Sequence, residues 1–175
     1  FSPNDNLKKE VIVLLPARLL WDKGIKDFFL VADRLKRKGA TAFFQCAGDR
    51  DPHNPECIPE SVIKEWSSTG NLEFLGRVEF LESLYRKASV VCLPSYHEGL
   101  PKVLLEAGAC GLPLVAYDVS GSREVISNGK NGFLVKLHDI DALENVLYKL
   151  IVNDDLRKSM GLESRKIVEG NFSED

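Results

Sequence analysis

The chain has 175 residues and a mass of 19.5 kDa, which fits one α/β domain and is short for two. Apolar residues make up 44% and charged residues 28% of the sequence, a balance that disfavours collagen-like, low-complexity and disordered proteins. The 23 basic and 26 acidic side chains give a net charge of -3, without the basic excess of most nucleic-acid-binding proteins, so no nucleic acid partner is predicted.

Short apolar runs along the chain are the predicted strands. They are continuous rather than alternating in hydrophobicity, which is typical of strands covered on both faces in a parallel sheet. None approaches the roughly 20 apolar residues of a membrane-spanning helix, so no membrane span is predicted. The predicted strands span residues 11–15, 42–47, 72–75, 90–93, 114–117 and 133–135.

Amphipathic stretches separate these strands. After the first one, Ile25, Phe28 and Leu35 recur at helical spacing, and Gly39 suits the C-terminal cap of that helix. The alternation of strands and helices predicts right-handed crossovers and an open, doubly wound parallel sheet of the α/β class, with ligands bound beyond the carboxyl ends of the strands. The further predicted helices span residues 58–67, 81–87, 101–110, 139–153 and 156–168.

The cysteines and the start of the chain indicate its context. The four cysteines have no metal-ligand or redox spacing, so reduced and mostly buried thiols of a cytoplasmic protein are expected. The chain begins at Phe1 without a basic or signal-like start, and residues 1–8 have the composition of a linker. We expect a piece of a longer protein, with a domain over residues 9–170.

Several nucleotide-binding motifs are missing. The loop at residues 16–20 lacks the Gly-x-Gly-x-x-Gly turn, and the chain has no Gly-x-x-x-x-Gly-Lys-Ser/Thr loop, which disfavours dinucleotide oxidoreductases and P-loop ATPases. Asp49 and Asp51 could hold a divalent metal ion through two carboxylates. A polar turn before Pro52 is the favoured interpretation, so no metal site is predicted.

The densest polar segment directly follows the fourth strand. Pro101 suits the first position of a helix, which places Gly99 and Leu100 near its cap and Glu98 in the preceding loop. Free backbone amides and the positive end of the helix dipole suit a phosphate group or sugar oxygens at this place. Glycine at position 99 would let a ligand approach the backbone.

Four further residues leave alternatives open. Glu106 has apolar neighbours in the predicted helix, where burial of an unpaired carboxylate would be costly; a ribose diol would satisfy it, and so would an internal Arg or backbone amides. Arg18 and Lys23 flank the first loop after a strand and could close on a diphosphate or be solvated cations. His97 could act as a general base, but a polar loop residue is the favoured interpretation.

Five segments in a fixed order carry a family resemblance. The most specific is Glu98-Gly-Leu-Pro-x4-Glu106. The others are Arg18-x4-Lys23-Gly24, Phe74-Leu-Gly-Arg-Val78, Gly111-Leu-Pro-Leu-Val-Ala116 through Gly121 to Glu124, and Asn128-Gly-x-Asn131-Gly-Phe-Leu-Val135. Together they resemble the carboxyl-terminal domain of group 1 glycosyltransferases, which are retaining family 4 enzymes of the GT-B fold. The resemblance runs from residue 1 to residue 173, and it implies that residues 171–175 begin a truncated C-terminal segment.

The resemblance implies a role for each matching residue. Arg18 and Lys23 would hold the diphosphate of a nucleotide sugar, and Glu98 would lie by the donor sugar; these three are the candidate catalytic residues. Glu106 would hold the ribose hydroxyls. The resemblance implies no metal and no cofactor, because the nucleoside diphosphate sugar is a co-substrate. The remaining donor-binding candidates are Gly99, Leu100, Lys102, Val103, Gly76, Arg77 and Val78.

The predicted function is that of the donor-binding domain of a retaining glycosyltransferase. Such an enzyme would transfer a hexosyl unit from a nucleoside diphosphate sugar, with UDP preferred and GDP as the alternative, to a glycan or lipid-linked acceptor in cell-envelope polysaccharide synthesis. In the family the acceptor site belongs to an amino-terminal domain, so this chain alone is expected to bind the donor without turnover. The expected location is the cytoplasm, with the inner face of the membrane as the alternative for the full-length enzyme.

The resemblance is incomplete at two places, and other functions remain open. Pro101 stands where many members have Gly or another residue, and Ser122-Arg123 stands where an apolar residue and Pro are common, which leaves donor and acceptor preference open. One alternative is half of a UDP-sugar 2-epimerase, against which the segment from Glu98 to Glu106 argues. The other is a non-catalytic module that binds nucleotide sugars.

Overall fold

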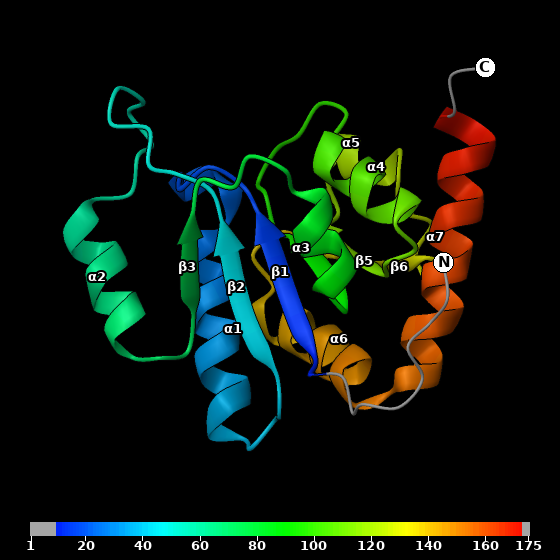
Figure 1. Cartoon of the computed structure of the whole chain (residues 1–175), viewed down its shortest axis with the longest axis horizontal. Helices are drawn as coiled ribbons and strands as arrows, with labels where there is room; N and C mark the ends of the chain where they lie inside the picture. Colours follow the sequence, from blue (N-terminus) through cyan, green and yellow to red (C-terminus); the bar gives the residue numbers. More distant parts are fainter. Residues whose placement is uncertain (1–9, 173–175) are drawn as a thin grey trace.

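The computed structural model describes residues 10–172, so the interpretation of residues 1–8 as a linker lies outside the described part of the chain. Six parallel strands form one sheet in the order β3-β2-β1-β4-β5-β6 (Figure 1). The order reverses between β1 and β4, and at such a point a doubly wound sheet leaves a crevice at its carboxyl ends. The strands are β1 (Ile12–Pro16), β2 (Phe43–Ala47), β3 (Glu73–Gly76), β4 (Val90–Leu93), β5 (Leu114–Tyr117) and β6 (Gly132–Val135).

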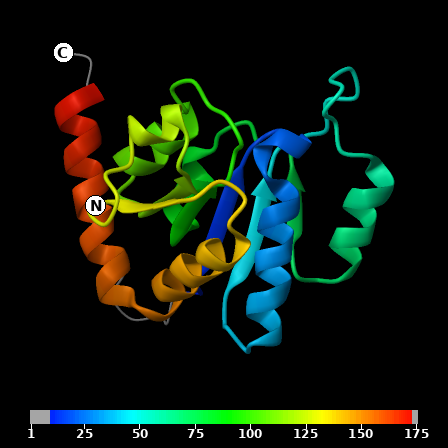
Figure 2. The ribbon, with the colours of Figure 1, turned by 180° about the vertical axis from the view of Figure 1, so that it is seen from behind.

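Helices cover both faces of this sheet. α1 and α6 pack against each other on one face, which is the near face in the view from behind (Figure 2). α3 and α4 lie on the opposite face, and α7 packs along α4 (Figure 1). The helices are α1 (Ile25–Arg37), α2 (Glu60–Ser68), α3 (Glu82–Lys87), α4 (Lys102–Ala109), α5 (Ser120–Arg123), α6 (Ile140–Val152) and α7 (Asp154–Phe172), with a short 3-10 helix, η1 (Trp21–Lys23).

The predicted doubly wound α/β sheet is confirmed, and every predicted strand is present with ends within one residue. The short elements η1 and α5 were not predicted. Pro101 is the N-terminal cap of α4 rather than its first residue, with ψ at 103°, because the chain is still extended there. Asn171 and Phe172 continue α7, whereas residues 173–175 of the predicted C-terminal segment lie outside the described part.

The core lies on both sides of the central strands. All residues of β4 and β5 are buried, which explains why their sequences are continuous apolar runs.

Gly39 caps α1 as predicted. It adopts φ +80°, and its amide donates to the carbonyl of Lys36 at 3.0 Å. The amide of Ala40 donates to the carbonyl of Leu35 at 3.0 Å. This pair of hydrogen bonds is the Schellman motif. It needs a residue in the left-handed conformation, which glycine adopts most easily.

Two glycines hold the loops at the carboxyl edge of the sheet against one another. A Cβ atom at Gly24, between η1 and α1, would lie 1.9 Å from the carbonyl oxygen of Pro94. A Cβ atom at Gly121, in α5, would lie 1.6 Å from the carbonyl oxygen of Gly99. Backbone therefore packs directly on backbone where the loops after β1, β4 and β5 meet.

No helix within residues 10–172 combines the length and the apolar character needed to cross a membrane.

Candidate functional site

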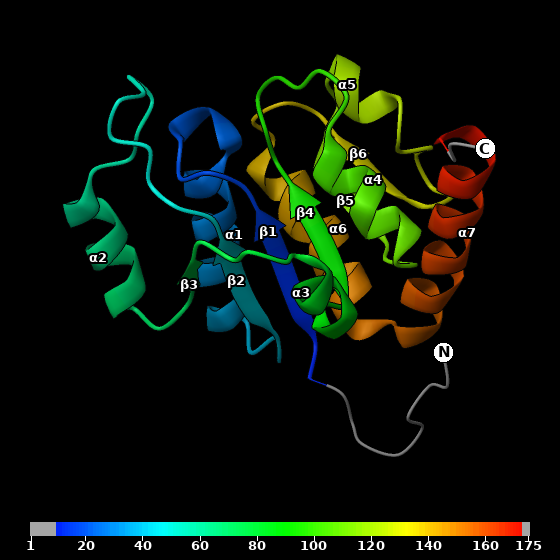
Figure 3. The ribbon, with the colours of Figure 1, turned by 45° about the horizontal axis from the view of Figure 1, so that its top comes forward.

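The predicted site residues lie at the carboxyl edge of the sheet. The loops that leave β1, β4 and β5 meet along this edge, which is tilted toward the viewer in Figure 3. α1 and α4 both begin there, so the positive ends of their dipoles point to the same region. The topology thus places the chemistry-bearing loops where α/β folds bind their ligands.

An ion pair joins the loops after β1 and β4. The ammonium nitrogen of Lys23 lies 2.8 Å from Oε1 of Glu98, although the two residues are 75 positions apart in the sequence. Their side chains are 22% and 13% exposed, so the pair is partly shielded and still reachable from solvent. Two of the three predicted catalytic residues are therefore in direct contact.

The residues beside this ion pair reinforce the same junction. The amide of Tyr96 donates to the carbonyl of Asp22 at 2.9 Å, and Nε2 of His97 lies 3.1 Å from Oδ2 of that aspartate. Oδ1 of Asp22 is buried and has no hydrogen-bond partner among the described residues. Residues 96–98 thus dock on residues 22 and 23. His97 itself is mostly exposed, in keeping with its interpretation as a polar loop residue.

A buried carboxylate in α1 holds the loop after β4 in place beside this ion pair. Asp27, in the first turn of α1, is 7% exposed and accepts hydrogen bonds from the hydroxyls of Tyr117 at 2.6 Å and Tyr96 at 3.3 Å. Burial and the negative charge of Asp27 raise the pKa of Tyr96 to about 12, and burial with the bond to Asp27 also raises the pKa of Tyr117. Both hydroxyls are therefore donors at neutral pH.

The sequence did not predict this network around Asp27. The available signal was a carboxylate in the first turn of an amphipathic helix, on the side that packs on the sheet. A charged side chain at such a position needs a partner. The partners themselves, on β5 and in the loop after β4, could not be named from spacing alone.

Unpaired amides surround the N-terminus of α4. Within residues 10–172, the amides of Gly99, Leu100, Lys102 and Val103 donate to no carbonyl or side chain. Pro101 has no amide to offer. The start of a helix normally leaves such donors for a cap, for water or for a ligand, and no side chain caps α4. The four predicted amide donors are therefore available to an anion or to sugar oxygens.

Glu106 lies farther along α4, and the prediction that it is buried among apolar neighbours is wrong. α4 buries Leu104 and Ala107, whereas Glu106 is on the exposed side of the helix. Its Oε2 accepts a hydrogen bond of 2.9 Å from the hydroxyl of Tyr85 in α3, and Oε1 has no hydrogen-bond partner among the described residues. The internal partner is thus a tyrosine, not the arginine or backbone amide considered from sequence.

A cavity of about 460 Å³ opens at the same edge, between the ends of β1, β2 and β3 and the side of α4. Arg18, Arg77, Val78 and Val103 line it. Nη1 of Arg18 lies 3.0 Å from Oδ2 of Asp51, and this guanidinium is 59% exposed. Its lining therefore combines apolar side chains, such as Val78 and Val103, with the charged groups of Arg18 and Arg77.

The structure separates the predicted site residues into neighbouring groups. Asp51 pairs with Arg18, and within residues 10–172 no three His, Cys, Asp or Glu side chains gather as metal ligands would. Gly76 ends β3 with φ +69°, directly before the cavity-lining Arg77. The groups are the cavity residues Arg18, Arg77, Val78 and Val103, the pair Lys23 and Glu98, the amides of Gly99, Leu100, Lys102 and Val103, and Glu106 with Tyr85.

Comparison with known proteins gives a family match over most of the chain. Residues 1–167 match the family described as Glycosyl transferases group 1. The chain is 36% identical over 160 residues to the Campylobacter jejuni N,N'-diacetylbacillosaminyl-diphospho-undecaprenol alpha-1,3-N-acetylgalactosaminyltransferase, which covers 91% of the chain and 40% of that protein. It is 29% identical over 170 residues to the Staphylococcus aureus capsular polysaccharide biosynthesis glycosyltransferase CapM, which covers 97% of the chain and 43% of CapM.

Solved structures agree on the fold. Anabaena HepE, crystallised in complex with UDP, superposes with a TM-score of 0.82 at 23% identity, over 94% of this chain and 45% of HepE. The predicted Rossmann-like fold, that of a GT-B domain, is confirmed. The chain spans less than half the length of each of these three proteins.

Proposed function

Because the chain belongs to the family of group 1 glycosyl transferases, we propose that it is the donor-binding domain of a retaining enzyme that transfers a hexosyl unit from a nucleoside diphosphate sugar. UDP is the proposed nucleotide, with GDP as the alternative, and the UDP complex of HepE supports this choice. The proposed acceptor is a glycan or a lipid-linked sugar of cell-envelope polysaccharide synthesis. The names of CapM and of the Campylobacter jejuni relative support it.

One observation carries the proposal. The Lys23–Glu98 ion pair lies in the loops beside the unpaired amides at the start of α4, and Glu106 is exposed on the same helix. A cation, free amides and a carboxylate are the groups that a diphosphate and the adjoining ribose require. The family membership favours transfer over the UDP-sugar 2-epimerase hypothesis.

In this proposal each group meets one part of the donor. Arg18 and Lys23 neutralise the charge that develops on the departing nucleoside diphosphate, which lowers the barrier because the charges are already in place. The amides of Gly99 and Val103 bind phosphate and sugar oxygens. Glu106 accepts hydrogen bonds from the ribose hydroxyls.

Lys23 has to change partners when the donor binds. In the free chain it is 2.8 Å from Glu98. A diphosphate carries more negative charge than one carboxylate, so it competes for the ammonium group. Once Lys23 turns to the phosphates, Glu98 is free to accept hydrogen bonds from hydroxyls of the donor sugar. Donor binding and exposure of Glu98 are thus one event.

We propose that the reaction needs no metal ion, because Arg18, Lys23 and the helix amides supply the positive charge. We also propose that the acceptor site lies on a further domain outside these 175 residues. The chain then binds the donor without turning it over. The enzyme would act in the cytoplasm, on acceptors at the inner face of the membrane.

Calorimetric titration with UDP, GDP and ADP tests the proposal, first in EDTA and then in Mg²⁺. We expect one nucleotide to bind in EDTA, with unchanged affinity in Mg²⁺. Glu106→Ala is expected to lower that affinity about ten-fold or more, because hydrogen bonds to a charged group are lost.

Glu73→Ala is the matched control for this titration. Like Glu106, Glu73 is exposed and accepts one hydrogen bond from a neutral side chain, the amide of Gln45 at 3.1 Å. Unlike Glu106, it lies at the start of β3, at the end of the sheet opposite the candidate site. Its loss should leave nucleotide affinity unchanged. Absence of binding by all three nucleotides, or equal losses in the two variants, would overturn the proposal.

A further inference from the structure

Tyr85 connects the cavity to the exposed carboxylate of α4. The tyrosine is 2% exposed, and its hydroxyl donates to Oε2 of Glu106 at 2.9 Å. Its amide donates at 3.0 Å to the carbonyl of Leu81, a residue that lines the cavity together with Val103 of α4. One buried residue of α3 therefore links the cavity wall, through its backbone amide, to the group proposed to hold the ribose, through its hydroxyl.

The hydrogen bond leaves Glu106 able to accept a diol. The tyrosine hydroxyl takes one lone pair of Oε2, so Oε1 and the second lone pair of Oε2 remain as two neighbouring acceptors on an exposed residue. An exposed glutamate without such a partner samples several rotamers and loses that freedom when it binds. A partner that fixes the rotamer beforehand removes this loss from the binding step.

The donor state of Tyr85 is stable. Burial, and then the negative charge of Glu106, raise the pKa of the tyrosine above its ordinary value. The hydroxyl therefore keeps its proton across the neutral and mildly alkaline range and cannot become a second negative group beside the carboxylate.

We infer that Tyr85 is a positioning residue, which holds Glu106 in the rotamer that accepts both hydroxyls of the ribose. The inference rests on the proposed function, since it requires that Glu106 binds a ribose. It goes beyond that function because it makes the selectivity for the diol depend on a residue that does not touch the ligand.

Tyr85→Phe tests the inference by removing one oxygen atom and leaving the ring in place. Affinities for UDP and for 2′,3′-dideoxy-UDP, which lacks both hydroxyls, are measured by calorimetry. The unmodified chain should prefer UDP about ten-fold or more, and Tyr85→Phe should reduce this preference about five-fold. The change should appear in UDP alone, because the analogue offers Glu106 no donor. A general structural defect would weaken both ligands equally and leave the preference unchanged.

Tyr117→Phe is the matched control. Tyr117 is also buried, at 0% exposure, and its hydroxyl also donates to a carboxylate, Asp27, at 2.6 Å. Its loss should leave the preference for UDP over the dideoxy analogue unchanged. In the Glu106→Ala background, Tyr85→Phe should change the preference no further, since the two residues act as one unit.

The outcomes separate the two claims. If Glu106→Ala abolishes the preference and Tyr85→Phe leaves it intact, the inference is overturned and the proposed role of Glu106 stands. If the unmodified chain binds UDP and its dideoxy analogue equally well, or binds neither, the ribose-binding role of Glu106 fails and the inference fails with it.

Discussion

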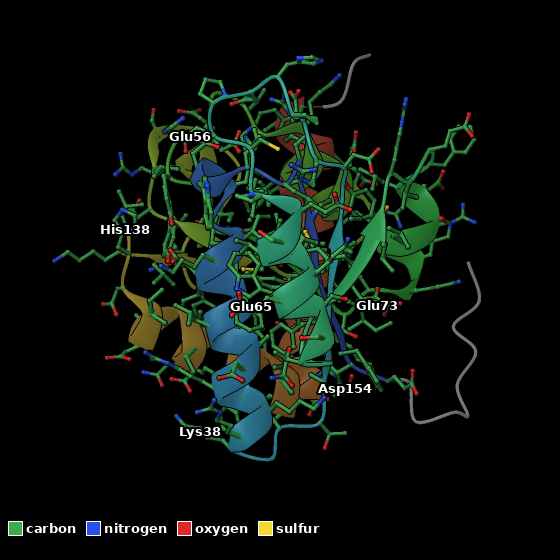
Figure 4. All side chains as sticks on the ribbon, turned by 90° about the vertical axis from the view of Figure 1, so that its left-hand side faces the viewer. Lys38, Glu56, Glu65, Glu73, His138 and Asp154 are labelled. Atoms are coloured by element: carbon green, nitrogen blue, oxygen red, sulfur yellow. The ribbon has the colours of Figure 1, made fainter. Side chains whose placement is uncertain are left out.

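A cavity of about 560 Å³ lies at the amino end of the sheet, and one of about 460 Å³ lies at the carboxyl end. The larger is lined by small residues of the α1–β2 turn and by Phe43 and Phe44. Its one ammonium group, on Lys36, already donates to the carbonyl of Gly70 at 3.2 Å. Figure 4 shows the two ends on one molecule, with Lys38 at the amino end and Glu56 at the carboxyl end.

The smaller cavity has the chemistry of a binding site. In a parallel sheet each crossover helix begins at the carboxyl edge, so amides without partners and positive dipole ends gather there. The loops at that edge also bring together charges from distant parts of the sequence, as Lys23 and Glu98 show. The unpaired amides and the charges gathered at the carboxyl edge, rather than cavity volume, therefore locate the candidate site.

The largest expected effect is a loss of stability on replacing a glycine, and it should differ between the carboxyl end of the sheet and the amino end. Gly24 and Gly39 have similar positive φ angles, +74° and +80°, but a Cβ atom at Gly24 would lie 1.9 Å from the carbonyl oxygen of Pro94, and nothing lies within 4 Å of one at Gly39. Gly39→Ala should cost about 1–2 kcal/mol of unfolding free energy, from backbone strain alone. Gly24→Ala should cost about 1–3 kcal/mol more, because the loops must move apart.

Urea denaturation of the two glycine variants measures this difference. Nucleotide affinity should fall only in Gly24→Ala, since the displaced loop carries Lys23. Equal losses of stability, with affinity retained in both, would mean that the backbone contact at Pro94 does not hold the site together.

The sequence predicts the fold well because its signals are local. Continuous apolar runs mark the buried strands, and Gly39 marks the end of α1 through a φ angle that side chains disfavour. The short elements η1 and α5 escape such signals. Their positions depend on tertiary contacts, at Gly24 against Pro94 and at Gly121 against the loop after β4.

The sequence predicts which residues form the candidate site, but it does not predict which of them pair. The segment from Glu98 to Glu106 was identified, but Glu106 was placed in the interior because its neighbours in sequence are apolar. Its exposure follows from which side of α4 packs on the sheet. Tyr85 is 21 positions from its partner Glu106, and Lys23 is 75 positions from Glu98. Sequence periodicity does not predict contacts over such separations.

A smaller effect is expected when a lysine is neutralised at each end. Lys23→Met should lower nucleotide affinity about ten-fold, because a charge-assisted bond to phosphate is lost. Lys36→Met, at the amino-end cavity, should leave affinity within about two-fold, since the lost bond to Gly70 is an exposed contact far from the ligand. Calorimetry with UDP at constant salt gives both values. If Lys36→Met weakened binding as much as Lys23→Met, the assignment of the site to the carboxyl end would fail.

The smallest expected effect comes from two aspartates of α1. Asp27→Asn keeps an acceptor for Tyr117 but removes the charge that strengthens the bonds to both tyrosines, so the loop carrying Glu98 is held less firmly. Nucleotide affinity should fall about two- to three-fold, because a hydrogen bond to a neutral amide stabilises the loop less than one to a carboxylate. Asp33→Asn should leave affinity unchanged, because Asp33 bonds to Asn71 and pairs with Arg37 away from the site.

Alkaline titration of tyrosine absorbance sharpens this last contrast. Burial is the larger cause that raises the pKa of Tyr96 to about 12, and the charge of Asp27 is the second. Asp27→Asn removes the charge of Asp27 and weakens its hydrogen bond but leaves the burial, so the pKa of Tyr96 should fall part of the way toward its ordinary value near 10. Asp33→Asn should not change it. A Tyr96 titration that is the same in both variants would show that Asp27 does not hold the loop after β4, and the affinity loss in Asp27→Asn would then need another cause.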